Sequence, residues 1–350
     1  MTALAELGGW PSVLAPLLAR RDLSFEQARA AFAEVLAGDA SPAQLAGFVV
    51  ALRTKGETIE ELSGLLAAML DAAVIVEVDT ALRDRLVDTC GTGGDRSHSI
   101  NVSTLAAFVV AGAGVPVYKH GNRAASSACG SADLLEALGV AIELDGAGTL
   151  HCLAEAGMAF CFAQRFHPAL RHAGPTRREL GVPTAFNVLG PLANPARVRR
   201  QVVGVGDPTL MDRMLGVLVA NGALAAMVVH GDGGLDELAL SGPSRILAFD
   251  GERTTSFTVE PSELGLMTAP HESVRGGGPS TNAGYARRVL DGEAGPHRDI
   301  VVLNAAAGLL VGGVVTTLAE GGDLARAVLD DGRAAGVLDR LIVASKAASA

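Results

Sequence analysis

The stretch that decides the interpretation of this chain is Asp88-Thr89-Cys90-Gly91-Thr92-Gly93-Gly94-Asp95-Arg96-Ser97-His98-Ser99-Ile100-Asn101-Val102-Ser103-Thr104. The apolar pair Leu86-Val87 before it is predicted to end a strand, and the apolar run 105–111 after it is predicted to be a buried helix. Glycines at 91, 93 and 94 permit positive φ angles and a close approach to a ligand. Ser103 and Thr104 place hydroxyls at the helix start, where free amides favour anions. The pattern is typical of a phosphate-binding turn.

This turn matches neither of two common nucleotide fingerprints. No Gly-Lys-Ser/Thr closes it, as a Walker loop requires, and Arg96 stands where the last glycine of the dinucleotide-binding pattern would be. A tight strand-to-helix connection that binds nothing has the same composition. The other segments of the chain must therefore decide.

Composition limits the classes of protein. A chain of 350 residues with 49% apolar residues and 43 glycines is long enough for about two domains and is typical of α/β enzymes. The net charge of −10 argues against a nucleic-acid partner or an anionic membrane surface. The N-terminus has no signal-peptide pattern, and no apolar run reaches a membrane span, so we expect a cytoplasmic location. Four cysteines without a Cys-x-x-Cys pair are expected to be core residues.

The N-terminal 80 residues are predicted to be helical. Ser24, Ser41-Pro42 and Thr58 are N-cap signals, and Gly38 and Gly56 stand where helices should end. The apolar positions exceed what one small bundle needs, so the excess packs either on another subunit or on the rest of the chain.

From Arg85 onward, short apolar runs alternate with helical stretches. This predicts a largely parallel sheet with helices on its faces, and ligands at the carboxyl ends of the strands. The candidate strands are Val115–Lys119, Ala141–Leu144, Met158–Ala163, Gln201–Val205, Ala225–His230 and Arg245–Phe249.

A second polar loop follows the candidate strand Val115–Lys119. It contains Lys119, His120, Asn122, Arg123 and several serines, and a helix is predicted to start near Ser131. Its cations are suited to charge-assisted bonds with a phosphorylated sugar. Since the loop comes one strand-helix unit after the glycine turn, we expect both to serve one ligand.

Two further clusters carry charge. Arginines between 165 and 178 include Arg177, which either pairs with a substrate carboxylate or belongs to a solvated face. Asp236 and Glu237 follow the candidate strand Ala225–His230 and are suited to Mg²⁺, although an acidic turn or N-cap has the same composition.

Taken together, five motifs resemble the anthranilate phosphoribosyltransferase family over most of the chain. In order they are Gly91-Thr-Gly-Gly-Asp95, Asn101-x-Ser-Thr104, Lys119-His-Gly-Asn-Arg123 with Ser126-Ser127 after it, Gly190-Pro-Leu-x-Asn-Pro195, and His230-Gly-x-x-Gly-Leu-Asp-Glu237. The resemblance implies an α/β fold with a small helical N-terminal domain and a larger α/β domain with a mostly parallel central sheet, like those of nucleoside phosphorylases and phosphoribosyltransferases. Residues 1–80 would form the first domain, with a later contribution near 178–200, and residues 81–350 the second. Family members usually form homodimers through the helical domain.

The resemblance also implies site residues and an activity, the transfer of a phosphoribosyl group from 5-phosphoribosyl 1-diphosphate to the amine of anthranilate in tryptophan biosynthesis. Anthranilate would contact Gly91, Asn122 and Arg177, and Mg²⁺ would be held by Ser103, Asp236 and Glu237. The phosphoribosyl diphosphate site would comprise Gly91, Gly94, Asp95, Ser99, Asn101, Val102, Ser103, Thr104, Lys119, His120, Gly121, Asn122, Arg123, Ala124, Ala125, Ser126, Ser127 and Ser131.

An aromatic amine needs no strong base and the reaction needs no covalent nucleophile, so His120 is a candidate only for assisting a proton transfer. Arg96, Ser99 and Pro175 depart from the family pattern and bear on affinity rather than on the reaction. Two alternatives are a pyrimidine nucleoside phosphorylase and a paralogue that retains the scaffold without catalysis. The intact motif Lys119–Arg123 and the pair Asp236-Glu237 argue against the first, and the acidic balance argues against a nucleic-acid-binding form of the second.

Overall fold

The protein is described by a computed structural model that covers residues 2–95, 97–124 and 128–349. In these residues one seven-stranded sheet has the order β3-β2-β1-β4-β5-β6-β7. Strands β1 to β5 are parallel, and β6 and β7 are antiparallel additions at one edge. The strands are β1 (Val87–Gly91), β2 (Val117–Gly121), β3 (Met158–Phe162), β4 (Arg200–Gly204), β5 (Ala225–His230), β6 (Ser244–Phe249) and β7 (Thr254–Val259).

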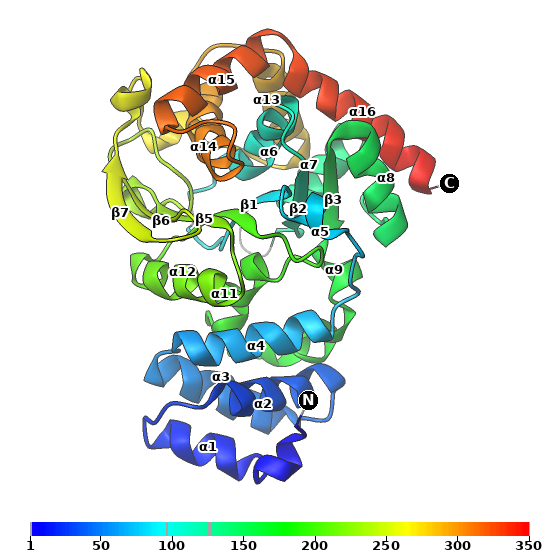
Figure 1. The fold of residues 1–350 in the computed structure, drawn as a ribbon, viewed down its shortest axis with the longest axis vertical. Coiled ribbons are helices and arrows are strands. Elements are labelled where there is room, and N and C mark those ends of the chain that lie inside the picture. Colours follow the sequence, from blue (N-terminus) through cyan, green and yellow to red (C-terminus); the bar gives the residue numbers. More distant parts are fainter. Residues whose placement is uncertain (1, 96, 125–127, 350) are drawn as a thin grey trace.

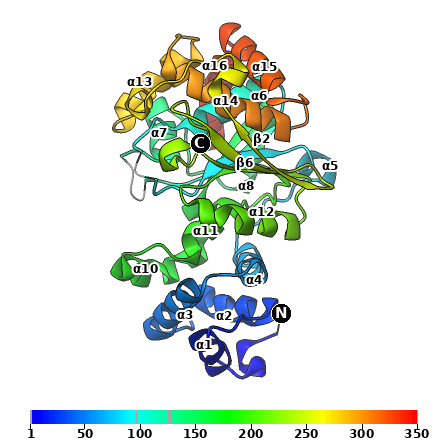
Figure 2. The ribbon, with the colours of Figure 1, turned by 90° about the vertical axis from the view of Figure 1, so that its left-hand side faces the viewer.

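Helices lie on both faces of the sheet and in a separate bundle. Figures 1 and 2 show α1 to α4 at one end of the molecule, α11 and α12 between this bundle and the sheet, and α6 with α13 to α16 beyond the opposite face. The helices are α1 (Pro11–Leu18), α2 (Phe25–Ala37), α3 (Pro42–Lys55), α4 (Ile59–Asp71), α5 (Thr80–Arg83), α6 (Val102–Gly112), α7 (Ser131–Leu138), α8 (Gly146–Ala156), α9 (Ala163–Phe166), α10 (Gly174–Leu180), α11 (Ala185–Leu192), α12 (Met211–Ala220), α13 (Pro279–Leu290), α14 (Pro296–Val311), α15 (Leu318–Asp330) and α16 (Arg333–Ser349). The predicted fold class is confirmed.

The sheet separates two apolar cores. In β5, Met227 and Val229 belong to the core on the side of α6 and α14, whereas Ala226 and Val228 belong to the core shared with α4, α11 and α12. This alternation follows from the two-residue period of a strand. Because both faces are covered, β3 (Met158–Phe162) is apolar throughout, and the polar residues of β1 and β2, such as Asp88 and Lys119, are themselves buried.

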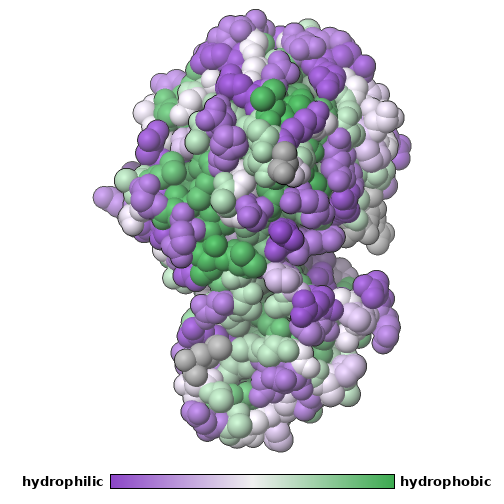
Figure 3. All heavy atoms as spheres, turned by 90° about the vertical axis from the view of Figure 1, so that its right-hand side faces the viewer, coloured by the Kyte–Doolittle hydropathy of each residue, from purple (hydrophilic) through white to green (hydrophobic). Residues whose placement is uncertain are grey.

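The predicted helix signals of the N-terminal part are confirmed. Ser24, Ser41 and Thr58 each cap a helix in a capping box, and Gly38 ends α2 in the left-handed conformation with φ 85°. Helix α10 packs on α3, and α11 packs on α3 and α4. We propose on these contacts that residues 1–80, with the later contribution near 178–200, form the helical domain. The molecule narrows between this part and the α/β part in the space-filling view (Figure 3).

Three expectations about strands are wrong or incomplete. Ala141–Leu144 is not a strand, because Ala141 N donates to Ser345 Oγ of α16 (3.0 Å) rather than to a neighbouring strand. Leu86-Val87 is where β1 begins, not where it ends, so the strand includes the residues up to Gly91. The exposed edge strand β7 was not predicted from the sequence. In the part of the chain that is described, no helix is long and apolar enough to cross a membrane.

Two glycines in the bundle should respond oppositely to alanine. A Cβ on Gly64 of α4 would overlap the carbonyl oxygen of Phe25, where α2 and α4 cross, whereas a Cβ on Gly47 of α3 would lie 3.8 Å from its nearest neighbour, Leu14. We expect Gly64→Ala to lower the free energy of unfolding by about 1–3 kcal/mol through overpacking. The matched control Gly47→Ala should raise it by up to about 1 kcal/mol, because glycine is a poor helix former. Urea titration of both variants checks this, and equal effects would contradict the packing argument.

Candidate active site

A cavity of about 350 Å³ lies at the carboxyl ends of β1, β2 and β5, and the predicted site residues converge on it. It is lined by Cys90–Asp95, Ser97–Thr104, Lys119–Ala124, Cys129–Ser131, Asn187, Asp236 and Glu237. Of the residues predicted to bind phosphoribosyl diphosphate or a metal, all described ones line this cavity. Ala125, Ser126 and Ser127, together with Arg96, lie outside the described residues.

The glycine turn begins at the end of β1. Gly93 and Gly94 have φ angles of 68° and 80°, as expected for a turn that needs glycine. Gly91 does not need a positive φ angle, because it lies in strand β1. Its lack of a side chain instead allows Asp236 to approach the strand closely. A Cβ there would overlap Asp236 Oδ2, and one on the neighbouring Gly204 would overlap Asp236 O. The strands β1 and β4 therefore accept the Asp236 segment directly against their ends.

The acidic pair is half-buried and bonded to the glycine turn and the helix that follows it. Asp236 Oδ2 accepts a hydrogen bond from Gly93 N (2.7 Å), and Glu237 Oε1 accepts one from Ser103 N at the start of α6 (3.0 Å). Burial raises the pKa of both carboxyls, and the neighbouring charge of Asp95 raises the pKa of each further. Asp95 Oδ2 is itself buried and has no hydrogen-bond partner among the described residues. A cation in the cavity would relieve this concentration of negative charge.

Lys119 brings the opposite charge to the same place. It is 1% exposed, and its Nζ donates to Thr89 O and, at 3.3 Å, to Ser103 Oγ. Below it, Asp88 Oδ2 accepts from Asn194 Nδ2 (2.9 Å), and Asn194 Nδ2 also donates to Tyr118 O (2.8 Å). Burial raises the pKa of Asp88 to about 6, although Lys119 and Asn194 act against that shift. Asn194, from the Gly-Pro-Leu-x-Asn-Pro motif, thus connects β1 and β2 near the start of each strand.

His120 lines the cavity as a neutral imidazole. Its pKa is lowered well below the usual value, mainly by burial and then by His167, whose ring centroid is 5.1 Å away. His120 Nε2 is buried and has no partner in the described part of the chain. A neutral imidazole can accept a proton or a hydrogen bond but cannot act as an acid at neutral pH.

Arg123 is already paired in this structure. Its guanidinium bonds to both carboxylate oxygens of Glu136 and to Asp133 Oδ1 (3.1 Å), both on α7, and lies 5.5 Å from the Phe162 ring centroid. Asp133 also accepts from Ala124 N (3.0 Å) and Gly130 N (2.9 Å), so it fixes both ends of the second loop. An anionic ligand must compete with these carboxylates for Arg123.

Among the predicted site residues that the structure describes, Arg177 alone does not line the cavity. It lies on α10 with its guanidinium 4.7 Å from the ring centroid of Phe186, and burial lowers its pKa. Phe186 is followed by Asn187, which does line the cavity, so Arg177 is one side chain away from it. Asn187 itself was not among the site residues predicted from the sequence. Its Oδ1 accepts from Thr184 N (3.1 Å), an N-cap pattern that signals a helix start rather than a site.

Other lining residues that sequence reasoning did not select are Cys90, Thr92, Gly93, Ser97, His98, Ile100, Cys129 and Gly130. Most of them lie within the predicted loops, so their inclusion follows from loop geometry rather than from their chemistry. All four cysteines are buried, as expected.

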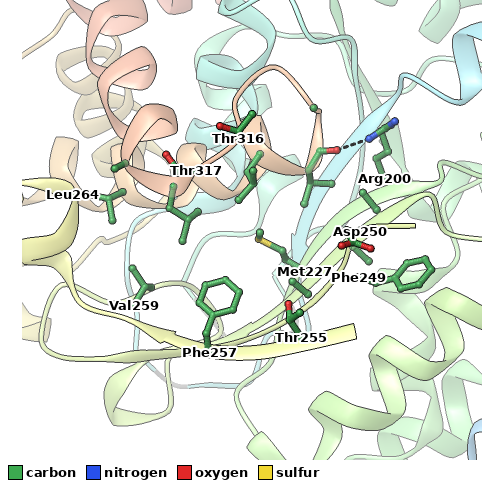
Figure 4. Close-up of a pocket in the computed structure, with 18 of the residues that line it drawn as sticks. Arg200, Met227, Phe249, Asp250, Thr255, Phe257, Val259, Leu264, Thr316 and Thr317 are labelled. Carbon is green, nitrogen blue, oxygen red and sulfur yellow. Dashed lines mark hydrogen bonds between the residues drawn. The ribbon is translucent and has the colours of Figure 1, made fainter. Parts of the chain in front are cut away.

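A larger cavity, of about 630 Å³, lies elsewhere and contains none of the predicted site residues (Figure 4). It is bounded by β5 to β7, including Met227 and Phe257, and by the end of α14 and the start of α15. Two of its polar side chains already have hydrogen-bond partners. Arg200 donates to Asp84 O (2.7 Å) and Val311 O (2.9 Å), and Thr317 Oγ1 accepts from Glu320 N (3.2 Å). The smaller cavity, with its charges and turn amides, is therefore the candidate active site.

Comparison with protein families matches nearly the whole chain. Residues 83–335 match the α/β domain of a glycosyl transferase family, and residues 11–73 match the helical bundle domain of the same family. The chain is similar to anthranilate phosphoribosyltransferase of Chloroflexus aggregans, with 50% identity over 95% of this chain and 97% of that one. It is also 49% identical to the protein of that name from Salinispora arenicola, over 95% of this chain and 96% of that one.

Solved structures agree in fold. The crystal structure of anthranilate phosphoribosyltransferase from Thermus thermophilus superposes with a TM-score of 0.90 at 44% identity, over 95% of this chain and 99% of that one. The Saccharomyces cerevisiae enzyme in complex with phosphoribosyl diphosphate and Mg superposes with a TM-score of 0.88 at 27% identity, over 97% of this chain and 98% of that one.

His167 should make stability depend on pH. Burial lowers its pKa to about 4, while its Nε2 bonds to Ala193 O (2.8 Å). In the unfolded chain the imidazole titrates near its usual value of about 6.5. Between these values the unfolded state binds more protons, so the stabilisation is complete above pH 6.5 and is lost as the pH falls. We expect this residue to cost about 2 kcal/mol of unfolding free energy between pH 7 and pH 5.

Urea titrations at pH 7 and pH 5 test this contribution. In His167→Gln, which keeps an N–H donor for Ala193 O, the loss between the two pH values should be smaller than in the parent protein by that amount. An unchanged loss would show that other groups carry the pH dependence.

Proposed function

The chain belongs to the anthranilate phosphoribosyltransferase family, and we propose that the cavity at the ends of β1, β2 and β5 is where it binds both substrates. The enzyme transfers the phosphoribosyl group of 5-phosphoribosyl 1-diphosphate to the amine of anthranilate, giving N-(5-phosphoribosyl)anthranilate and pyrophosphate, a step of tryptophan biosynthesis. The observation that carries the proposed location is the meeting of a glycine turn, a buried lysine and a half-buried acidic pair in one cavity.

The pyrophosphate group is assigned to the glycine turn and the start of α6. Amides at a helix start and in a glycine turn favour anions, and α6 begins at Val102. The Lys119 ammonium, held by Thr89 O and Ser103 Oγ, adds a fixed positive charge. The ribose 5-phosphate is assigned to the second loop, which includes Asn122, Arg123 and Ser131. Ser131 Oγ donates to Asn122 O (3.2 Å), which orders the start of α7 against that loop.

The donor set fits Mg²⁺. Ser103, Asp236 and Glu237 supply a hydroxyl and two carboxylates, the oxygen ligands that Mg²⁺ prefers, while substrate phosphates complete its shell. The raised pKa values of the two carboxyls and the unpartnered Asp95 Oδ2 indicate a place where a cation stabilises the charge. When bound, Mg²⁺ offsets the negative charge that develops on departing pyrophosphate.

The chain's own residues supply position and charge rather than a covalent step. The anthranilate nitrogen attacks C1 of the ribose, the C1–O bond to pyrophosphate breaks, and the configuration at C1 inverts. Lys119 and the turn amides stabilise the leaving group. The nitrogen is unprotonated at neutral pH, so no strong base is required, and neutral His120 is placed to assist the loss of the amine proton. Holding both substrates at the same strand ends supplies much of the remaining acceleration.

Anthranilate is assigned to Gly91, Asn122 and Arg177. Gly91, at the end of β1, and Asn122, on the second loop, both line the cavity. Arg177 carries the charge that suits the ring carboxylate. The Saccharomyces cerevisiae relative has also been solved with 4-fluoroanthranilate, at 26% identity and a TM-score of 0.87, and this supports an acceptor site within the same fold.

The protein is further proposed to form a homodimer through its helical domain and to reside in the cytoplasm. The exposed apolar side chains Leu18 (79% exposed) and Val50 (41% exposed) lie on α1 and α3 and support an interface there.

The reaction is tested by following the fluorescence of anthranilate after the purified protein is mixed with anthranilate, phosphoribosyl diphosphate and Mg²⁺. We expect the signal to fall with time and to stay constant in the presence of a chelator. Binding of phosphoribosyl diphosphate without consumption of anthranilate would show that another acceptor is used.

Arg177→Ala separates the two substrates. We expect the KM for anthranilate to rise at least about 10-fold, because one charge-assisted contact contributes about 1.5–3 kcal/mol. The KM for phosphoribosyl diphosphate should stay within about 2-fold, since that ligand is held by the two loops. The matched control is Arg178→Ala, an exposed neighbour on α10, which should leave both constants unchanged. Equal increases for both substrates in Arg177→Ala would contradict the assignment.

A further inference from the structure

Asn304 is a polar side chain in the apolar helix α14. It is 3% exposed and stands between Leu303 and Ala305, which are both fully buried. Burying an amide costs free energy unless its oxygen and nitrogen find hydrogen-bond partners. The partners of this amide therefore indicate what it is for.

The amide bonds to the backbone of a single residue across the fold. Asn304 Oδ1 accepts from Leu238 N (2.8 Å), and Asn304 Nδ2 donates to Leu238 O (2.9 Å) and to Ile300 O in its own helix (2.9 Å). The side chain thus pairs with both backbone groups of Leu238, as a neighbouring strand would. Leu238 lies in a segment that is neither helix nor strand, so no regular ladder fixes it.

Leu238 directly follows the acidic pair. The same segment also lies against two glycines, and any side chain at either position would collide with it. A Cβ on Gly204 would overlap Asp236 O, and one on Gly231 would overlap Glu237 O. The backbone that carries the two carboxylates is therefore held from two directions. Glycines at the ends of strands contact it on one side, and the buried amide of Asn304 binds it on the other.

We propose that Asn304 is a positioning residue for the Mg²⁺-binding carboxylates, an inference that rests on the proposed role of Asp236 and Glu237. Asn304 does not line the cavity. It fixes the backbone at Leu238, and this sets the directions in which Asp236 reaches Gly93 N and Glu237 reaches Ser103 N. Groups that orient metal ligands in this way change metal affinity about 10–100-fold when they are removed.

The test uses Asn304→Leu, which keeps the approximate volume and removes both hydrogen bonds to Leu238. We expect the Mg²⁺ concentration for half-maximal activity to rise at least about 10-fold. Excess Mg²⁺ should restore part of kcat. A direct measurement accompanies the assay. Mn²⁺ binding in the presence of phosphoribosyl diphosphate, followed by electron paramagnetic resonance, should weaken by a similar factor.

Ser345→Ala is the matched control. Ser345 on α16 is equally buried and accepts a backbone hydrogen bond from Ala141 N (3.0 Å), but it is not part of the acidic segment. It should lower the thermal midpoint without changing the metal requirement. If it changes the metal requirement as much as Asn304→Leu does, general stability is the cause and the positioning role is refuted.

A second variant covers the case in which Asn304→Leu does not fold. Asn304→Asp keeps the shape and the acceptor but, when ionised, cannot donate to Leu238 O, so a raised metal requirement is again expected. Wild-type Mn²⁺ binding in either folded variant would overturn the proposal. A parent protein without any Mg²⁺-dependent transfer would instead refute the proposed function.

Discussion

The close approach of the Asp236 segment to the ends of β1 and β4 is the constraint on which the site depends. Asp236 occupies space that a side chain at Gly91 or Gly204 would fill. The parallel register aligns these two glycines as direct partners across the β1–β4 ladder. The two glycines thus allow the segment after β5, which contains Asp236, to lie against the glycine turn. The proposed metal ligands, the turn amides and the start of α6 then lie within one cavity of about 350 Å³.

Charge is distributed in a way that composition alone does not reveal. The chain carries a net charge of −10 but must bind an anionic sugar. Lys119 supplies a buried positive charge, and a divalent cation would stabilise the charges of the half-buried Asp236 and Glu237. The attraction for phosphate is therefore confined to the cavity, where water is scarce and each charge acts over a short distance. The outer surface can remain acidic without excluding the substrate.

The sequence predicts most of the fold because its signals are local. The caps at Ser24, Ser41 and Thr58 and the apolar strands depend on short windows of residues. Ala141–Leu144 has the alternating burial of a strand, but its contact partner is α16, some 200 residues away. The same limit applies to the site. The two loops are visible as motifs, whereas Asn304 lies in an apolar helix and acquires meaning only from its contact with Leu238. The place of Arg177 one side chain outside the cavity also depends on tertiary packing.

Because Arg123 is paired with Glu136 and Asp133, a ligand must replace these carboxylates before it can bind the guanidinium. An arginine that already has two carboxylate partners contributes to affinity only the difference between its new pair and its old one. A dianionic phosphate can compete for the guanidinium, while an uncharged sugar offers nothing in exchange. If the second loop binds the ribose phosphate as proposed, the ion pairs of Arg123 would favour phosphorylated sugars over free ribose and neutral nucleosides. The cell's abundant unphosphorylated sugars would leave this loop in its resting arrangement.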